Sequence, residues 1–497
     1  MKPNLKLGYI NIKGDEKALK LNQLLKGLSY EVLKGSVDLN IKKINYNSKE
    51  VETGDVFFCI KGFKADGHEF ARDAIKRGAI AIVCEEPLVI GDSVTVIKVQ
   101  DSRKALSLCS SNYYDKPSTK MKIIGITGTN GKTTTAFMMK SVLEKAGYKV
   151  GIIGTVANYI GHKMIKSSRT TPESLELQKL FSDMVKEKVD YCVMEVSSHS
   201  LALDRVYGIK FSNAIFTNLT QDHLDFHKTM EEYFKAKSIL FNNSCSNILN
   251  IDDQYGLRLF EMFKHSKTYA IEGTGNIMAT HIINNSKGVK FSTIINEKRE
   301  EIELKIPGIH NVYNGLAVIE TAILNGIDIE YIKNGLKEAK VIGRCELIEH
   351  NDKIDFDIII DFAHTPDGLE KILKSAREFT KGRLLCVFGC GGDRDSIKRP
   401  IMGNIATNLS DMAIITSDNP RQEEPIDIIN DILKGVETNN YIVEENRREA
   451  IFKAMKLAKK DDVIVVAGKG HENYQILKDK TIEFDERKVI AELLEKL

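Results

Sequence analysis

A glycine-rich segment is the clearest place in this chain where residue types and spacing indicate chemistry. It is IIGITGTNGKTTT at residues 123–135, where Gly128, Gly131, Lys132 and Thr133 form the spacing G-x-x-G-K-T after an apolar strand. The backbone N–H groups of such a turn and of the following helix bind an anion, the lysine adds a charge, and a threonine hydroxyl reaches Mg²⁺. The segment is shorter than the full G-x-x-x-x-G-K-[ST] pattern or departs from it. The alternative is therefore an ordinary turn between a strand and a helix. We predict phosphate binding, because G-K-T-T directly after an apolar strand is hard to obtain by accident.

Two further polar residues follow predicted strands in the same part of the chain. Glu195 lies on a short apolar strand predicted at residues 193–196, and His223 lies just beyond a second strand predicted at residues 214–219. Ligands of α/β proteins bind outside the carboxyl ends of the strands. We therefore expect Glu195 and His223 to converge on the glycine-rich segment. The alternative is that each is simply a solvated or capping residue.

A lysine on an apolar helix face is the third feature. Residues 231–241 predict a helix whose apolar face carries Tyr233, Leu240 and Phe241. Lys237 falls on that face, four residues after Tyr233 and four before Phe241. A lysine on a buried face must extend its amine to solvent, find a partner or change its chemistry, and the first is the usual outcome.

Near the C-terminus, four apolar strands are predicted, each followed by a polar loop. The strands are Ile358–Ile360, Leu384–Phe388, Met412–Thr416 and Val463–Ala467. If they lie parallel in one sheet, their loops gather along one edge, which is where such folds build a site. The side chains brought together would be those of Arg394, Asp418, Asn419, Arg421 and Glu472. Unrelated surface loops are the alternative.

The elements that must position these residues alternate between strands and helices, which predicts an α/β fold. We predict three domains: an N-terminal α/β domain at residues 1–117, a central domain with a parallel sheet at 118–342, and a Rossmann-like C-terminal domain at 343–497. The central domain opens on the glycine-rich segment. Residues 1–20 are Lys-rich and weakly patterned, and we interpret them as a loose extension.

Within the N-terminal domain, strand and helix signals alternate. A turn at Gly54 leads into a strand within residues 51–60, a helix is predicted at Phe70–Gly78 with the glycine at its end, and a buried strand follows at Ala79–Val83. Residues 114–118, with their proline, are interpreted as the linker to the next domain.

Composition argues against a nucleic-acid or membrane partner. The chain is 42% apolar and 28% charged with a net charge of +2, so no strong field favours either surface. The N-terminus lacks the apolar core of a signal peptide, and no window approaches the ~18 uninterrupted apolar residues of a membrane span. The eight cysteines are scattered and form no C-x-x-C pair. We expect reduced thiols and a cytoplasmic location rather than disulfides or zinc.

The motifs together resemble those of the Mur ligases of peptidoglycan synthesis, and within that family those of the members that add the third residue of the stem peptide. The resemblance covers nearly the whole chain apart from its first twenty or so residues. Its motifs are the segment at Gly128–Thr134, RTTP at Arg169–Pro172, EVSSH at Glu195–His199, DHLD at Asp222–Asp225, His310 and Asn311 with Asn314, Gly343 and Arg344, DFAHTP at Asp361–Pro366, and the last three C-terminal loops. Their order and spacing together are highly specific.

This resemblance implies an ATP-dependent amide ligation. ATP, UDP-N-acetylmuramoyl-L-alanyl-D-glutamate and a diamino acid would give an amide, ADP and phosphate, through an acyl phosphate and then a tetrahedral intermediate. The protein would act mainly by positioning its substrates and neutralising their charge.

The resemblance also implies which residues bind ATP and metal. The ATP phosphates would be held by Gly128, Thr129, Asn130, Gly131, Lys132, Thr133 and Thr134, while Asn311 would lie against the adenine, Asp361 near the ribose and Arg344 against phosphate. Thr133 and Glu195 would hold one Mg²⁺, and His223 would help to hold a second. Lys237 aligns with a carbamylated lysine that supplies an oxygen ligand suited to Mg²⁺. The catalytic residues would be Lys132, Glu195, His223 and Lys237.

The substrate residues follow in the same way. Ser48, Thr170, Thr171, Ser197 and Arg205 would hold the UDP-sugar substrate in the first two domains. The chain departs from the family there, with Tyr46-Asn47-Ser48-Lys49 in place of Leu-Asp-Ser-Arg and Leu203 in place of a frequent Gln.

The loop Asp418-Asn419-Pro420-Arg421 accompanies meso-diaminopimelate in this family. Arg421 and Arg394 could grip the distal carboxylate of that substrate bidentately, and Glu472, Asp418 and the Gly468 carbonyl suit its ammonium. L-Lysine lacks a distal carboxylate and would leave an arginine unpaired. Meso-lanthionine has both groups and stays open as an alternative.

Two other function classes remain as alternatives. A related ligase such as folylpolyglutamate synthase would share the phosphate segment and the lysine, but we expect it to lack the loops at residues 169–172 and 418–421. A P-loop switch or motor would need partner surfaces, whereas the C-terminal loops of this chain suit a small zwitterion. The expected partners are small molecules only, with no nucleic acid or membrane, and a monomer is favoured.

Overall fold

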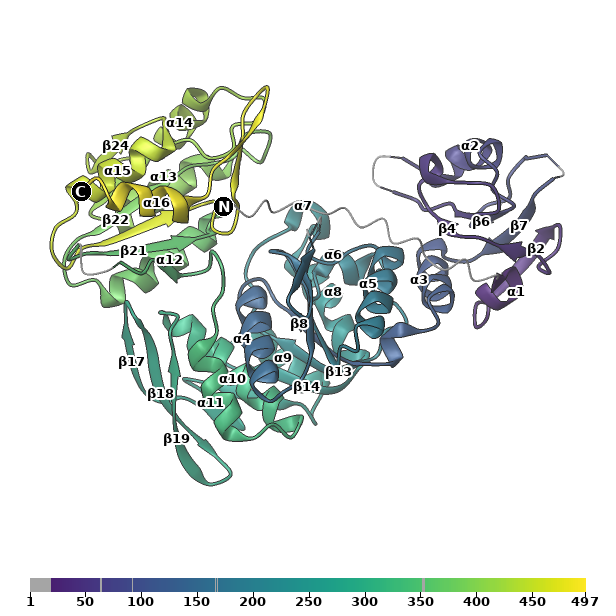
Figure 1. Ribbon diagram of the computed structural model, residues 1–497, viewed down its shortest axis with the longest axis horizontal. Coiled ribbons are helices and arrows are strands. Elements are labelled where there is room, and N and C mark those ends of the chain that lie inside the picture. The colour runs from purple at the N-terminus through teal and green to yellow at the C-terminus, as the bar shows by residue number, and fades with distance from the viewer. Residues whose placement is uncertain (1–18, 63–64, 92, 166, 168, 351–353) are drawn as a thin grey trace, which may run out of the picture. The chain divides into compact units, whose positions relative to one another are not determined.

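The computed structural model of the protein describes residues 19–62, 65–91, 93–165, 167, 169–350 and 354–497 (Figure 1). The predicted N-terminal extension lies outside these residues except for Leu19 and Lys20. Chain contacts define two compact units: one contains the described residues up to Lys120 with 172–186 and 199–209, and the other contains the rest. The domain limits at 117/118 and 342/343 remain predictions.

The first unit is built on a five-stranded sheet. Its strand order is β2 (Tyr30–Lys34), β7 (Thr95–Val99), β6 (Ala81–Cys84), β5 (Val56–Phe58) and β4 (Ile44–Asn45), and only the β2–β7 pair is antiparallel. A separate short pair joins β1 (Leu19–Lys20) to β3 (Asn40–Ile41). The helices are α1 (Leu21–Leu24), α2 (Ala71–Lys76), α3 (Ser102–Tyr113) and α5 (Ser174–Lys186), with α6 (Ser198–Ala202) at the edge of the unit. Gly78 follows α2 at φ +107°, as expected for a glycine beyond a helix end.

The second unit begins with a nine-stranded sheet. Its order is β11 (Lys163–Ile165), β10 (Asn158–Ile160), β9 (Val150–Ile153), β12 (Tyr191–Glu195), β8 (Lys122–Thr127), β13 (Phe211–Phe216), β14 (Ser244–Asn250), β15 (Lys267–Ala270) and β16 (Ile277–Met278). All neighbours from β9 to β16 are parallel. β8, which leads into the glycine-rich segment, therefore lies between β12, which carries Glu195, and β13, which precedes His223.

The helices around this sheet are α4 (Lys132–Lys145), α7 (Leu224–His227), α8 (Met230–Asn242), α9 (Gln254–Met262), α10 (Ile309–Leu324) and α11 (Ile329–Glu338). A three-stranded antiparallel sheet follows in the order β17 (Thr280–Asn285), β18 (Gly288–Ile295) and β19 (Lys298–Leu304). The strand predicted at 214–219 begins and ends earlier than expected. Its predicted last residues have left the sheet, and Asn218 and Thr220 bond the glycine-rich segment instead.

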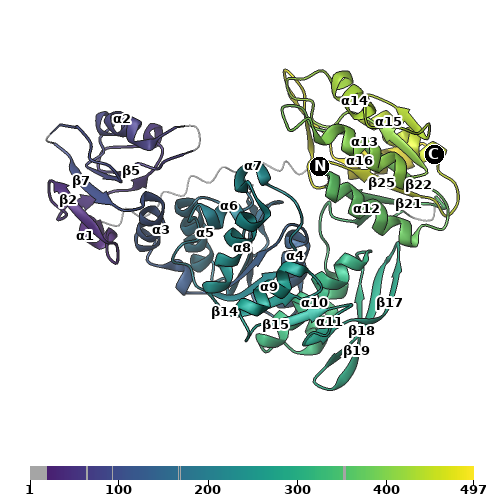
Figure 2. The ribbon, with the colours of Figure 1, turned by 180° about the vertical axis from the view of Figure 1, so that it is seen from behind.

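The C-terminal sheet has the order β20 (Glu346–Leu347), β21 (Asp357–Asp361), β25 (Val463–Ala467), β22 (Leu384–Phe388), β23 (Met412–Ile415) and β24 (Tyr441–Val443). Only β20 is antiparallel to its neighbour. Helices α12 (Pro366–Phe379), α13 (Lys398–Leu409) and α14 (Pro425–Leu433) pack on one face, and α15 (Arg447–Leu457) and α16 (Glu486–Leu494) on the other (Figures 1 and 2). A hairpin joins β26 (Tyr474–Ile476) to β27 (Thr481–Glu483).

Side-chain alternation along the strands explains this layered arrangement. Val465 of β25 packs toward α12 and α13, whereas its neighbours Ile464 and Val466 pack toward α15 and α16. Both faces are apolar, as is typical of a parallel sheet covered by helices. The α/β fold predicted from the alternation of elements is confirmed. Within the described residues, none of the helices combines the length and apolar character needed to cross a membrane.

Candidate active site

The glycine-rich segment forms a tight turn between β8 and α4. Gly128 has φ +147° and Gly131, at the N-cap of α4, has φ +86°. A side chain at Gly128 would collide with the Thr217 hydroxyl, and one at Gly131 would meet Asn314 Oδ1 at 2.5 Å. The two glycines thus let the backbone fold closely enough to present the first N–H groups of α4, which is the geometry of an anion site.

Lys132 lies inside this turn. Its Nζ donates hydrogen bonds to the carbonyl oxygens of Gly128 at 2.9 Å and Thr129 at 2.8 Å. Burial lowers the pKa of Lys132, while the charge of Glu195 acts in the opposite direction. The amine is therefore held by the loop itself and can move from these carbonyls to a phosphate.

Glu195 ends β12 and is 1% exposed. Its Oε1 accepts hydrogen bonds from Thr133 Oγ1 at 2.9 Å and from the Thr155 N–H at 3.0 Å, and its Oε2 accepts from Thr155 Oγ1 at 3.0 Å. The predicted convergence of Glu195 on the glycine-rich segment is thus observed. A hydroxyl and a carboxylate in contact are hard oxygen ligands of the kind that Mg²⁺ prefers.

Lys237 does not extend to solvent. It is 2% exposed on α8, its Nζ donates to the Gly128 carbonyl at 2.8 Å, and it lies 4.6 Å from the centroid of the Tyr233 ring. Burial, followed by the charge of Lys132, lowers the pKa of Lys237 well below its usual value. Burial therefore favours the neutral form of this amine, which is its nucleophilic form.

His223 contacts the same tyrosine. It has φ +53°, its ring meets the edge of Tyr233 with centroids 6.2 Å apart, and its Nε2 lies 3.4 Å from Asp222 Oδ2. The structure brings Thr133 and Glu195 into direct contact, and both His223 and Lys237 contact the Tyr233 ring. Among the residues it describes, no group of three or more His, Cys, Asp and Glu side chains is arranged to hold a metal.

A cavity of about 530 Å³ gathers most of the residues predicted to bind ATP. Its walls include Thr129, Asn130, Gly131, Lys132, Thr133, Thr134, Asn311, Arg344 and Asp361, whereas Gly128 does not line it. The Asn311 amide is engaged by its own helix, since Nδ2 donates to the Pro307 carbonyl at 2.7 Å and Oδ1 accepts from Asn314 at 3.0 Å.

Arg344 and Asp361 also line this cavity. Asp361 Oδ2 accepts from the Cys345 N–H at 2.7 Å, and burial raises the pKa of this carboxyl while Arg344 lowers it. The Arg344 guanidinium lies 4.9 Å from the centroid of the Phe362 ring. Its Nε is buried without a hydrogen-bond partner among the described residues, so it remains able to bind an anion.

A second cavity, of about 940 Å³, lies at the carboxyl edge of the C-terminal sheet. Six residues predicted to bind the amino acid line it, namely Arg394, Asp418, Asn419, Arg421, Gly468 and Glu472, whereas Pro420 does not. The strand order β21-β25-β22-β23 places their loops side by side, as predicted from the parallel pattern. Seven residues line both cavities: Thr129, Asn130, Asp222, His223, Phe362, His364 and Thr365.

The residues predicted to bind the UDP-sugar belong to both units. In the first, Ser48 begins a 3₁₀ turn and Arg205 Nη2 pairs with Glu173 Oε1 at 2.9 Å. In the second, Thr171 Oγ1 donates to the Glu195 carbonyl at 2.9 Å and accepts from the Ser197 N–H at 3.1 Å. Thr170 and Ser197 line the first cavity.

Comparison with known proteins identifies the family. The family model for the Mur ligase middle domain matches residues 126–322, that for the Mur ligase glutamate ligase domain matches 343–470, and that for the Mur ligase catalytic domain matches 40–114. A UDP-N-acetylmuramoyl-L-alanyl-D-glutamate–2,6-diaminopimelate ligase of Clostridium acetobutylicum is 57% identical over 481 residues, covering 96% of this chain and 100% of that protein. The protein of the same name from Clostridium botulinum is 59% identical over 484 residues, with 96% and 100% covered. The chain belongs to the Mur ligase family.

A solved structure of a ligase with that name agrees with this membership. It has a TM-score of 0.70 and 26% identity, and the match covers 97% of this chain and 99% of the other. The family resemblance and the enzyme class predicted from the sequence are therefore confirmed: the protein is a Mur ligase. The roles of individual residues remain predictions.

Several residues of this Mur ligase site were not predicted. Thr155, which bonds both oxygens of Glu195, and Tyr313, whose hydroxyl donates to Asp252 Oδ2 at 2.9 Å, line the first cavity. Thr155 lies outside the motifs, and Tyr313 lies between the motif residues Asn311 and Asn314, so no sequence signal pointed to either side chain. Lys469 differs from these two residues, because it lies within the loop at 468–472 that the sequence singled out. The sequence nevertheless indicated no role for it.

Proposed function

We propose that this Mur ligase joins meso-2,6-diaminopimelate to UDP-N-acetylmuramoyl-L-alanyl-D-glutamate, with ATP as the source of energy. The observation that carries the proposal is the common wall of the two cavities, formed in part by Asn130, His223 and His364. An acyl phosphate made beside the glycine-rich segment would therefore lie next to the amine of a substrate bound by the C-terminal loops. Holding both reactants in one site removes most of the entropic barrier to their reaction.

The glycine-rich segment would bind the ATP phosphates through the N–H groups that begin α4. Lys132 would move from the loop carbonyls to the phosphates. Arg344, whose Nε is buried without a partner among the described residues, would neutralise further charge. The substrate carboxylate would attack the γ-phosphorus, a P–O bond to that carboxylate would form, and ADP would leave. The amine of the diamino acid would then displace phosphate from the acyl carbon.

Mg²⁺ is part of the proposal, and the donor set fits it. Thr133 and Glu195 offer a hydroxyl and a carboxylate in contact at 2.9 Å, next to the phosphate turn. Mg²⁺ bound there would neutralise the charge of the phosphates. Glu195 would keep its orientation through Thr155, which bonds both of its oxygens.

Lys237 would act as a carbamate. A neutral lysine amine attacks CO₂, forms a C–N bond and releases one proton, which leaves a group with one negative charge and two oxygen atoms. The burial of Lys237 supports this chemistry, because it shifts the amine toward its unprotonated form. The Gly128 carbonyl, which now accepts a hydrogen bond from Lys237 Nζ, places the amine against the phosphate turn.

The second cavity has walls of opposite charge, which suits a zwitterionic head. Arg421 and Arg394 would bind the distal carboxylate, and Asp418, Glu472 and the Gly468 carbonyl would bind the distal ammonium. Ser48, Thr170, Thr171, Ser197 and Arg205 would bind the UDP-sugar substrate. The names of relatives that are 57% and 59% identical support diaminopimelate over L-lysine.

The experiment that tests the proposal measures phosphate release with ATP and UDP-N-acetylmuramoyl-L-alanyl-D-glutamate. Meso-diaminopimelate, meso-lanthionine and L-lysine are compared, and each substrate is omitted in turn. We expect release only with all three substrates and fastest with diaminopimelate. Rapid ATP hydrolysis without the nucleotide-sugar would favour a switch or motor, and a preference for L-lysine would contradict the assigned amino acid.

A further inference from the structure

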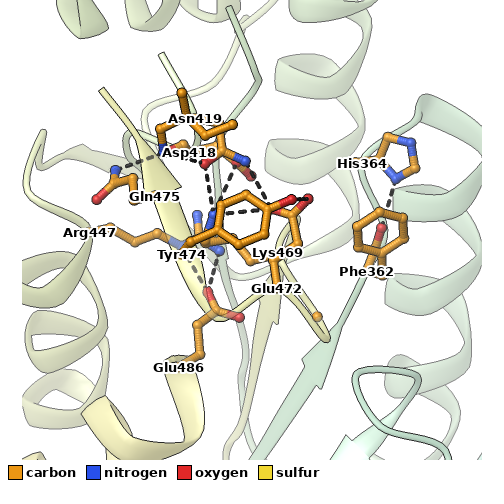
Figure 3. Close-up of polar contacts among 12 residues, drawn as sticks. Phe362, His364, Asp418, Asn419, Arg447, Lys469, Glu472, Tyr474, Gln475 and Glu486 are labelled. Atoms are coloured by element: carbon orange, nitrogen blue, oxygen red, sulfur yellow. Dashed lines mark hydrogen bonds and ion pairs between the residues drawn. The ribbon is translucent and has the colours of Figure 1, made fainter. Parts of the chain in front are cut away.

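Lys469 is a buried lysine that none of the proposed roles uses. It follows β25, between Gly468 and Gly470, and is 0% exposed. Its Nζ donates to Asn419 Oδ1 at 3.1 Å and Glu472 Oε2 at 3.2 Å, and lies 3.7 Å from Asp418 Oδ1 (Figure 3). All three of these residues line the amino-acid cavity, so the lysine lies directly behind its wall.

The backbone of the loop is shaped to bury this side chain. Gly468 has φ +121° and Gly470 has φ +52°. A side chain at Gly468 would meet Asp418 Oδ2 at 2.6 Å, and one at Gly470 would meet Phe362 Cβ at 2.6 Å. Lys469 is therefore inserted between two positions that only glycine fills without displacement.

The lysine fixes the orientation of Asn419. The Oδ1 atom of this amide accepts from both Lys469 Nζ and the Ile476 N–H at 2.9 Å. Its Nδ2 must therefore face the other way, and it donates to Glu472 Oε2 at 2.8 Å. Glu472 Oε2 thus has two strong donors.

The other oxygen of Glu472 has only a weak contact with the neighbouring hairpin. Tyr474 donates to Glu472 Oε1 at 3.4 Å, which is long for a hydroxyl donor. Oε1 is therefore the atom of Glu472 best able to accept a hydrogen bond from a bound ammonium. Lys469 and Asn419 determine this by holding the opposite oxygen.

The charges behind the wall compensate each other. Arg447 and Glu486 are both 0% exposed and pair through Nε and Oε1 at 2.8 Å. Arg447 also donates to the Ala467 carbonyl at 2.8 Å and the Ser417 carbonyl at 3.4 Å, which fixes the ends of β25 and β23. The charge of the wall itself then depends on Asp418, Glu472 and Lys469 alone, where two carboxylates face one ammonium.

We propose that Lys469 is a positioning residue that orients Asn419 and Glu472 and reduces the charge of the Asp418–Glu472 wall to a single negative unit. The wall then takes one ammonium and tolerates a carboxylate bound nearby at Arg421, which is the pattern of a zwitterionic head. This inference rests on the proposed function. Without Lys469, the wall would carry two negative units, attract a plain ammonium more strongly and repel the carboxylate.

The test is the selectivity of Lys469→Met, which keeps the length of the side chain and removes its charge. We expect the KM for meso-diaminopimelate to rise roughly 10- to 100-fold, because charge-assisted hydrogen bonds of the wall are lost, while the KM for ATP stays within about twofold. The ratio of kcat/KM for meso-diaminopimelate to that for L-lysine should fall at least about tenfold. A purely structural defect would lower both values together and leave the ratio unchanged.

A second variant separates charge from shape. Lys469→Met combined with Asp418→Asn restores a single negative unit. The ratio should therefore recover in part relative to Lys469→Met alone, although Asp418→Asn also removes the charge of one proposed ligand of the ammonium. Lys488→Met is the matched control, because Lys488 is exposed and pairs with Glu483 in the same domain. An unchanged ratio in Lys469→Met, or no recovery in the double variant, would overturn the inference. If the wild-type enzyme does not use meso-diaminopimelate at all, the proposed function fails instead.

Discussion

Arg421 offers the sharpest test of the amino-acid site. Its Nη1 donates to the Gly392 carbonyl at 2.8 Å and the Asn419 carbonyl at 3.4 Å, and the residue lines the second cavity. Two loops thus hold the guanidinium in place before a substrate arrives. A preorganised arginine binds a carboxylate through two parallel charge-assisted hydrogen bonds.

The expected loss in Arg421→Ala follows from these contacts. Each hydrogen bond to a charged group contributes about 1.5–3 kcal/mol, and the two released carbonyls can be solvated from the cavity. A net loss of about 3 kcal/mol corresponds to a KM for meso-diaminopimelate that is roughly 100-fold higher. The backbone strain at φ +55° is unchanged, because alanine and arginine both carry a Cβ.

Steady-state phosphate release with each substrate varied in turn measures the effect. The KM for ATP should stay within about twofold, because Arg421 does not line the first cavity. The KM of Arg421→Lys for meso-diaminopimelate should lie between those of the wild type and Arg421→Ala, since lysine keeps the positive charge but lacks the two parallel donors of the guanidinium. Arg448→Ala is the control, because it removes an arginine of α15 that pairs with Glu492 of α16. Equal losses for ATP and diaminopimelate would refute the assignment of Arg421 to the distal carboxylate.

Three further predictions concern buried charges. Lys237→Ala should lower kcat at least about 100-fold, and an added short-chain carboxylate should restore part of the activity. Full activity of this variant without an added carboxylate would exclude the carbamate. Arg447→Met should lower the free energy of unfolding by about 3–5 kcal/mol in chemical denaturation, because it leaves Glu486 buried and unpaired; adding Glu486→Gln should recover much of the loss. His471 has its pKa lowered to about 4 by burial, and then by nearby cations, so the folded state binds fewer protons than the unfolded state between pH 4 and 6.5. The free energy of unfolding should therefore fall as the pH drops through that window, by about 1–2 kcal/mol after allowance for partial exposure. His471→Gln should flatten this dependence of stability on pH. The control His265→Gln, at an exposed site, should not.

The parts of the fold that the sequence predicted well are those where burial alone decides the structure. β22 and β25 are buried along their whole lengths, and their predicted bounds, Leu384–Phe388 and Val463–Ala467, agree with the structure at both ends. The helix predicted at 231–241 corresponds to α8, Met230–Asn242. The end of β13 was misplaced because Asn218 bonds Thr129 of the phosphate turn and Leu219 bonds the Asp253 carboxylate, rather than a neighbouring strand.

Residues of the candidate site could be predicted where a single structural rule determines their position. They could not be predicted where the two interacting residues are distant in sequence. The carboxyl-edge rule brought Arg394, Asp418 and Glu472 together because it needs only strand order. Nothing in a single sequence pairs Arg447 with Glu486 or Lys469 with Asn419, since these contacts cross 39 and 50 residues. A lysine or arginine without a known partner is expected at the surface.

The second unit contains two parallel sheets, and each presents candidate site residues at its carboxyl edge. This arrangement suits the two steps of the proposed ligation. The carboxyl edge of the nine-stranded sheet presents the phosphate turn, and the carboxyl edge of the C-terminal sheet presents the amino-acid loops. Asn130 of the turn donates to Asp367 Oδ2 at 2.7 Å, at the start of α12. Helix α12, which begins at the edge of the C-terminal sheet, therefore contacts the phosphate turn at the edge of the nine-stranded sheet. The residues proposed to act in catalysis lie at the first edge, and those proposed to select the amine, Arg421 and Lys469, lie at the second. Substitutions at the second edge should therefore change which amine is used while leaving the formation of the acyl phosphate intact.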